Sequence, residues 1–355
     1  MIRLVRGTLA VLLACAAAAS ACGGPDRDVM AVPPPTVADA APPEAESVAV
    51  TPVPPTVEAD AGGEPVAPLA PPPPSDFDAG PFIASPANAD VFITLNQASM
   101  RKHPVAKRAG PLLAQLPVFS ALAASSIDLV RDVDWTMTWG SSVVRIDHGI
   151  FVTQPNVDDA TTDRAIEGAA KKHPNGGLFD AGVPGVDATL GSTGSSERAF
   201  LRPQSKLLVI AHRTHAAAAA SELKSRRPKD PNPKETIRVV IKRPSTKLSL
   251  SRVKLDDVSE LRATLVLKDA DGSGDVRVEA DYADAKKAAA AVAELNDALK
   301  NANSIAVRIV TRGLLNNAAF GTDGNRAVLK LAVPQEQLEG ILQVLAGSLG
   351  VTLSP

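Results

Sequence analysis

Acidic side chains at alternate positions mark a candidate cation site late in the chain. The segment 269–276, DADGSGDV, matches the start of an EF-hand calcium loop, with oxygen ligands at positions one, three and five and glycine at six. Position twelve, which needs a bidentate glutamate, is Ala280, and the flanking segments alternate like strands. Asp-Gly and Ser-Gly between alternating strands are hairpin signals. We therefore expect a hairpin turn here and no metal.

The histidines favour structural roles over metal binding. His212 and His215 form an HxxH pair without a neighbouring third ligand, and we expect Thr214 to cap a helix with His215 in its first turn. The others are scattered: His103, His148 and His173, the last before a proline at an expected helix end.

Nucleophile and phosphate motifs are also incomplete. The run at 191–196, GSTGSS, lacks the lysine of a phosphate loop and the frame of a nucleophile elbow, so we expect a loop between strands. Carboxylate pairs for hydrolysis cannot be recognised from spacing alone. We predict no catalytic residue and no cofactor.

Two apolar features could line a ligand cavity. Trp135 and Trp139 share one face of an alternating strand with Val133 and Met137, which favours the core over a stacking platform. Residues 110–130 are nearly all apolar and are expected to form core helices interrupted by Pro117. A lid over a greasy cavity is the alternative for that segment.

The N-terminus has the layout of an export signal. Arg3 and Arg6 precede an apolar run at 7–21 that closes with Ala19-Ser20-Ala21 before Cys22. The run has about 15 residues, fewer than the roughly 20 that a spanning helix needs. These features predict a secretory signal at residues 1–21.

The same residues resemble the lipobox of bacterial lipoproteins. In that family the cysteine is acylated on sulfur, the signal is removed and the new N-terminus is acylated, so the resemblance implies a palmitate-type anchor on Cys22. Two chains make such anchoring stable. Cys15, after Leu12-Leu13-Ala14, and ordinary cleavage after Ala21 are the alternatives. Since the chain has two cysteines, the body then lacks thiols, which excludes disulfides and zinc–thiolate sites.

The segment that follows Cys22 differs in composition from the rest of the chain. Residues 23–85 hold 16 of the 30 prolines, ten acidic residues and one basic residue. Such a sequence cannot bury a core and favours extended polyproline conformation. We expect residues 22–85 to form the lipidated N-terminus and a disordered linker.

The body from residue 86 onward is mildly basic. The chain has a net charge of −2, the signal carries +2 and the linker −9, which leaves about +5 for the body. Basic residues are not clustered enough to indicate nucleic-acid binding. Two short basic runs, at 101–108 and 226–229, are expected in solvated loops, with weak attraction to anionic headgroups as the alternative.

Period-two alternation predicts half-buried strands at 133–139, 261–268, 276–282 and 327–333. Apolar stripes predict helices at 158–172, 215–224, 284–300 and 334–346. Strands followed by a helix thus recur at about 136–172, 186–224, 260–300 and 317–346. This layout is similar to that of uncharacterised bacterial envelope proteins built from repeated strand–strand–helix units.

We therefore expect an α+β body in two similar halves, 86–225 and 235–355, each a mostly antiparallel sheet with helices on one face, joined by a proline-rich loop at 226–234. The predicted function is that of a lipid-anchored, non-catalytic binding or scaffolding protein of the cell envelope. Its partner is the membrane, through Cys22, and its body is extracytoplasmic, with the outer membrane favoured over the inner. The alternatives are a carrier of a lipid or other hydrophobic ligand in a sheet–helix cavity, and a hydrolase with dispersed carboxylates.

Overall fold

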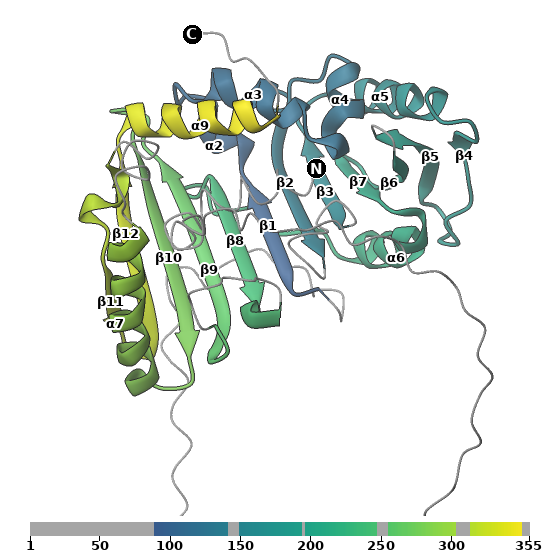
Figure 1. Ribbon diagram of the computed structural model, residues 1–355. Coiled ribbons are helices and arrows are strands. Elements are labelled where there is room, and N and C mark those ends of the chain that lie inside the picture. Colours follow the sequence, from purple (N-terminus) through teal and green to yellow (C-terminus); the bar gives the residue numbers. More distant parts are fainter. Residues whose placement is uncertain (1–88, 141–148, 194–195, 247–254, 303–312, 350–355) are drawn as a thin grey trace, which may run out of the picture. The chain divides into compact units, whose positions relative to one another are not determined.

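The computed structural model describes residues 89–140, 149–193, 196–246, 255–302 and 313–349 (Figure 1). Cys15, Cys22, the signal, the linker and His148 lie outside these ranges. The described residues form an α+β fold in which twelve strands build one sheet and seven α-helices pack on it. Every strand pair in the sheet is antiparallel. The predicted α+β class is confirmed.

The sheet is continuous from one edge to the other. Its order is β11-β12-β10-β9-β8-β1-β2-β3-β7-β6-β5-β4. The strands in chain order are β1 (Val91–Leu95), β2 (Val133–Gly140), β3 (Ile150–Pro155), β4 (Gly177–Leu178), β5 (Asp187–Thr193), β6 (Ser196–Gln204), β7 (Leu207–Ala211), β8 (Ile237–Lys242), β9 (Val258–Leu267), β10 (Gly274–Tyr282), β11 (Phe320–Asp323) and β12 (Arg326–Val333).

The helices follow the strands at the predicted places. The α-helices are α2 (Gln97–Met100), α3 (Ala106–Ala114), α4 (Ser120–Ala124), α5 (Asp159–Lys171), α6 (Ala216–Ser225), α7 (Ala285–Ala302) and α9 (Gln335–Leu349). Short 3₁₀ turns are η1 (Pro117–Phe119), η3 (Arg213–His215), η4 (Pro244–Thr246) and η5 (Leu314–Asn317). The recurring order of strands followed by a helix is confirmed.

The two predicted halves do not appear as separate sheets. β1 lies in the middle of the sheet, where it pairs with β2 on one side and with β8 on the other. Val91, for example, is opposite Gly140 of β2 and Ile241 of β8. A strand from the N-terminal part therefore joins the C-terminal strands to the rest, and the fold is a single sheet.

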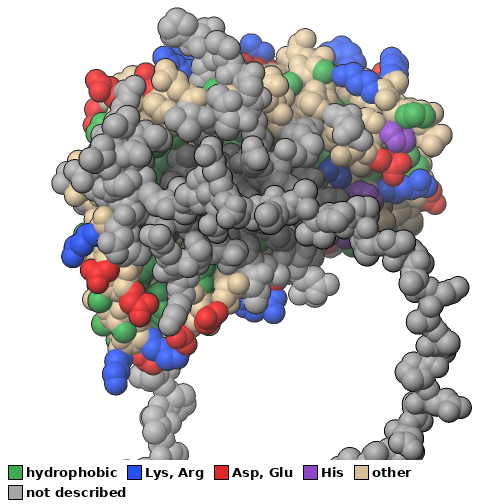
Figure 2. All heavy atoms as spheres, viewed as in Figure 1, with side chains coloured by type: hydrophobic (Ala, Val, Ile, Leu, Met, Phe, Trp, Pro, Cys, Tyr) green, Lys and Arg blue, Asp and Glu red, His purple; other side chains and the backbone are tan. Residues whose placement is uncertain are grey.

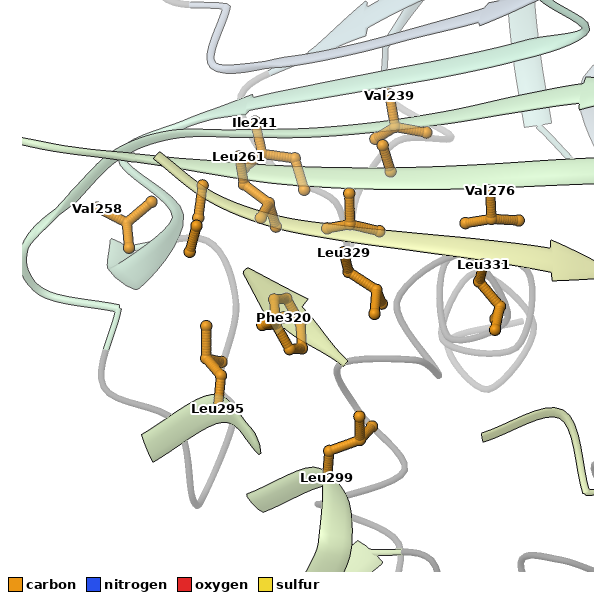
Figure 3. Close-up of a cluster of buried hydrophobic side chains, with 14 of the residues drawn as sticks. Val239, Ile241, Val258, Leu261, Val276, Leu295, Leu299, Phe320, Leu329 and Leu331 are labelled. Carbon is orange, nitrogen blue, oxygen red and sulfur yellow. The ribbon is translucent and has the colours of Figure 1, made fainter. Parts of the chain in front are cut away.

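On strands β8 to β12, one face of the sheet is covered by α7 and α9. Ile241, Leu261, Val278 and Leu329 are buried there with Leu295 of α7, and we call this group the α7 cluster. Figure 3 shows the leucines of α7 directed toward Phe320 and Leu329. Asn296 of α7 also accepts a hydrogen bond from the backbone N–H of Phe320, 2.8 Å away, which ties the helix to β11.

Strands β3, β6 and β7 carry apolar side chains on both faces, and β2 does so only through Val133. The tryptophan cluster, which includes Trp135, Met137 and Trp139, packs with Leu223 of α6 on one face. The α5 cluster packs alternate residues of the same strands on the other face, beneath α4, α5 and η1, and includes Phe151, Phe200, Leu208, Leu122 and Ile166. Because side chains alternate along a strand, the two clusters lie on opposite faces of the sheet.

Val133 departs from the predicted pattern. It belongs to the α5 cluster, whereas Trp135 and Trp139 belong to the tryptophan cluster. The register with β3 shifts between Val133 and Trp135, from Pro155 to Gln154. This bulge adds a residue to β2 and moves Val133 to the opposite face, so the prediction that all four odd positions share one face is wrong.

Residues 110–130 form short helices as predicted. Pro117 begins η1 after α3 ends, and α4 follows directly. Leu122, Ile127 and Leu129 are buried in the α5 cluster. This segment therefore packs on the face opposite Trp135, and the two predicted apolar features do not line one common space.

Among the residues that the structure describes, none of the helices is both long and apolar enough to cross a membrane.

Candidate functional site

The side chains that alternate with the α7 cluster form a second, polar face on β8, β9, β10 and β12. Transverse rows run across this face: Arg238 is opposite Thr264, Thr264 opposite Arg277, and Arg277 opposite Lys330. We call it the charged face and define it by Arg238, Glu260, Arg262, Thr264, Val266, Asp275, Arg277, Glu279, Asp281, Arg326, Val328, Lys330 and Ala332.

Arg262 is the centre of an ion network on the charged face. Its guanidinium lies 2.6 Å from a carboxylate oxygen of Glu260 and 3.8 Å from one of Glu279, and it also contacts Asp281. Arg277 donates to Glu279 from its Nε, 3.0 Å away, and Arg326 lies 3.1 Å from Asp281. Opposite charges directly across antiparallel strands stabilise the pairing of those strands.

Much of this network is shielded from water. The side chain of Glu279 is 1% exposed and that of Arg262 10%. Burial is the main cause of a raised pKa at Asp281, although Arg262 and Arg326 act in the opposite direction. Burial likewise raises the pKa of Glu235, whose carboxylate lies 3.7 Å from Arg238. These carboxylates hold the arginines in fixed positions.

A hollow of about 430 Å³ opens on the charged face beyond the network. Thr264, Val266, Asp275, Arg277, Lys330 and Ala332 line it, together with the strands at Val276 and Leu331. The side chains of Val276 and Leu331 belong to the α7 cluster on the other face, so the backbone of β10 and β12 supplies the floor there. Apolar and charged groups thus share one small concavity, which is the usual make-up of a small-molecule site.

Sequence reasoning did not identify this site. The alternating patterns of β9 and β10 place Arg262, Arg277, Glu279 and Asp281 at polar positions, which indicates only the solvent-facing side of a half-buried strand. The signal that points further is the opposite charge at partnered positions, such as Arg262 across from Glu279. That signal becomes readable only when the register is known.

The candidate metal-ligating side chains of the sequence do not form a metal site among the described residues. Within the described ranges, no three His, Cys, Asp or Glu residues form a group that could hold a metal ion. His212 and His215 lie with their ring centroids 6.3 Å apart. His212, and not Thr214 as predicted, caps the turn, because its Nδ1 lies 2.8 Å from the Thr214 hydroxyl and accepts from the Thr214 backbone N–H.

His103 joins two parts of the fold. It is 2% exposed, and its Nδ1 accepts a hydrogen bond from the backbone N–H of Val105, 3.1 Å away. Its Nε2 lies 3.2 Å from the carbonyl oxygen of Ser273, to which it can donate. The ring therefore links the start of α3 to the hairpin between β9 and β10.

The first basic run is structural and not a solvated loop. Arg101 donates to the carbonyl oxygens of Val130 and Val133 and lies 2.6 Å from the Asp134 carboxylate. Arg108 lies 3.2 Å from Glu339 of α9. The prediction for this run is wrong because its arginines find carboxylates and carbonyls on neighbouring elements.

The second basic run is exposed at Arg226, Arg227 and Lys229, as expected for a solvated loop. The proline-rich loop at 226–234 nevertheless contacts the body. Arg227 donates to the Gln154 side chain, 2.9 Å away, and Pro228 is buried. Asp230 accepts from the indole N–H of Trp135 at 3.0 Å. Hydrogen bonding of that N–H, with the ring 3% exposed, assigns Trp135 to the core rather than to a stacking platform.

The glycine- and serine-rich run is partly strand. Gly191 to Thr193 end β5, and Ser196 begins β6, while Gly194 and Ser195 lie outside the described ranges. A Cβ at Gly191 would lie 2.9 Å from the backbone of Ala169, so α5 packs directly on this glycine. The prediction of a loop is therefore wrong for Gly191 to Thr193, where the small side chain serves close packing.

The Asp269 segment forms the predicted hairpin turn between β9 and β10. Lys268 and Ser273 close it with a backbone hydrogen bond of 2.8 Å, and Gly272 has a φ of +66°. The Asp271 carboxylate accepts from the backbone N–H and the hydroxyl of Ser273, at 3.0 and 2.6 Å. One of the proposed calcium ligands is thus engaged in shaping the turn.

Asp271→Ala should reduce the dependence of the melting temperature on pH between pH 7 and pH 2. The Ser273 hydroxyl is the main cause of a lowered pKa at Asp271. A carboxyl with a lowered folded-state pKa stabilises the fold above its ordinary pKa of about 3.9, and loses this effect as the pH falls through the folded value. We expect wild type to melt above Asp271→Ala at pH 7, and the difference in melting temperature to vanish at pH 2. Asp269→Ala is the control, and a constant difference at both pH values would contradict the assignment.

No family model matches this chain, and no curated protein and no solved structure matches it either.

Proposed function

We propose that this chain is a lipid-anchored, non-catalytic binding protein of the bacterial cell envelope. In this proposal Cys22 carries the acyl chains, residues 22–85 are the tether, and the α+β body is extracytoplasmic and does the binding. The support for the anchor is the small-residue sequence Ala19-Ser20-Ala21 before Cys22, after a short apolar run with an arginine-containing start.

The charged face is the observation that carries the binding role. Hydrophobic side chains on β8 to β12 pack beneath α7 and α9, whereas the opposite side of the same strands presents fixed arginines and carboxylates beside a hollow. A rigid sheet positions such groups more accurately than a loop does. In the view of Figure 2, acidic and basic side chains are interspersed on the part of the described surface that is visible.

The hydrolase alternative fits this arrangement less well. A catalytic acid or base must reach a substrate proton, but the carboxylates of Glu260, Glu279 and Asp281 each contact Arg262. The carrier alternative gains support from a different observation, the apolar wall that Val266 and Ala332 give to the hollow.

Cys22→Ala should release the protein from the membrane. Without the thiol no lipid chain can be attached through sulfur, and Ala19-Ser20-Ala21 still suits ordinary signal cleavage. Fractionation should find wild type in detergent-extracted membranes and Cys22→Ala in the soluble extracytoplasmic fraction. Cys15→Ala is the matched control and should remain membrane-bound. Release of Cys15→Ala together with retention of Cys22→Ala would reject the assignment.

A further inference from the structure

The hollow on the charged face contains one cation that has no ion partner within the described ranges. Arg277 is neutralised by Glu279, and Asp275 lies 2.8 Å from Lys268. Lys330 is exposed and forms no ion pair with any residue that the structure describes. The balance of charge in the hollow is therefore about one unit positive.

Small apolar side chains lie in the row of the sheet next to Lys330. Lys330 lies next to Arg277 and Thr264 in one transverse row, and the next row consists of Val266, Asp275 and Ala332. One end of the hollow is therefore lined by a cation. The other end is lined by the small apolar side chains of Val266 and Ala332, with the carboxylate of Asp275, which is paired with Lys268, between them. A volume of about 430 Å³ falls within the roughly 300–1,000 Å³ of small-molecule pockets.

We propose that this hollow binds a free monoanionic amphiphile, a small molecule with one acidic headgroup and one apolar group. The headgroup pairs with the ammonium of Lys330, and the apolar group packs on Val266, Ala332 and the exposed backbone of β10 and β12. Charge complementarity selects the anion, because a cationic headgroup would meet Lys330 with like charge. This inference rests on the proposed binding role and specifies its ligand class.

A pair of fluorescent probes separates charge from apolar packing. 1-Anilinonaphthalene-8-sulfonate carries one sulfonate, and N-phenyl-1-naphthylamine has the same arylamine skeleton without charge. The experiment uses the full-length chain with Cys22→Ala, so that no acyl chain of the protein competes for the hollow. We expect saturable binding of both probes, with the sulfonate bound more tightly.

Two variants in the hollow test the proposed contacts. Lys330→Met should weaken sulfonate binding about fivefold, the size of one partly exposed ion pair, and leave the neutral probe unchanged. Ala332→Trp should fill the hollow and abolish saturable binding of both probes. Lys286→Met is the matched control, because Lys286 is an exposed lysine on α7, which packs on the opposite face, and it should bind like the parent.

The outcomes decide between the sources of the ligand. Absence of saturable sulfonate binding, equal effects of Lys330→Met and Lys286→Met, or persistence of binding in Ala332→Trp would overturn the proposal. So would co-sedimentation with phosphatidylglycerol vesicles that depends on Lys330, since it would assign the lysine to a bilayer surface. The fractionation of Cys22→Ala does not depend on any of these results, so failure here leaves the anchoring proposal separately testable.

Discussion

Arg262→Met is expected to lower the free energy of unfolding by about 3–4 kcal/mol, because it leaves buried carboxylates without their central cation. Arg262 contacts Glu260, Glu279 and Asp281, and the Glu279 side chain is 1% exposed. After the substitution, Arg277 and Arg326 remain to balance three carboxylates. Urea unfolding followed by circular dichroism measures the change, with the midpoint read at an unchanged slope.

A second variant distinguishes charge imbalance from lost packing. Arg262→Met with Glu279→Gln removes one buried charge of each sign, and we expect it to be more stable than Arg262→Met alone. Lys287→Met is the control, since its ion pair with Asp257, 2.7 Å apart, is half exposed; it should leave the urea midpoint unchanged. If Arg262→Met unfolded at the same urea concentration as Lys287→Met, the network would be solvated and the shielding argument would be wrong.

Two central strands, β1 and β8, explain why the sequence pattern predicts two sheets and not one. Period-two alternation correctly predicts β2, β9, β10 and β12, because each has one apolar and one polar side over most of its length. β1 and β8 read VFITL and IRVVIK, and neither alternates strictly. They lie in the middle of the sheet and have buried apolar side chains on both faces. Short apolar runs of this kind cannot be distinguished from helix by periodicity.

Those two strands carry the global topology. If β1 is not recognised between β2 and β8, the sequence divides into two halves at the proline-rich loop. The backbone hydrogen bonds of β1, which join the two halves, cannot be predicted from the local pattern. The bulge at Val133 also cannot be recognised from the sequence pattern. A register shift leaves the alternation of Trp135, Met137 and Trp139 intact. Local patterns predicted elements, whereas the pairing of distant strands required the structure.

The contacts of the charged face also could not be predicted from the sequence. Its residues were visible as polar positions in β9, β10 and β12, but their mutual contacts depend on which residue lies opposite which. Lys330 carries no sequence signal at all, because a single lysine in an alternating strand is ordinary on a solvated face. Its meaning comes from the hollow and from the pairing of Arg277 and Asp275 with other residues.

Gly176→Ala is expected to cost about 3 kcal/mol, at the upper end of overpacking effects. A Cβ at position 176 would lie 1.9 Å from the carbonyl oxygen of Ala170 and 2.6 Å from its carbonyl carbon. Both are backbone atoms in the last turn of α5, so a change of side-chain rotamer cannot relieve the overlap. The turn after α5, closed by the 2.9 Å hydrogen bond from Gly176 N–H to the His173 carbonyl, would have to open or move.

Gly321→Ala provides the matched control for this substitution. Gly321 lies in β11, where a Cβ would meet no atom within 4 Å, and alanine suits a strand at least as well as glycine. Urea unfolding should therefore give Gly321→Ala a midpoint at or above that of wild type and Gly176→Ala a much lower one. Equal midpoints for the two variants would show that the turn at 172–176 relaxes easily, and α5 would then be held by the α5 cluster alone rather than by its close backbone contact with Gly176.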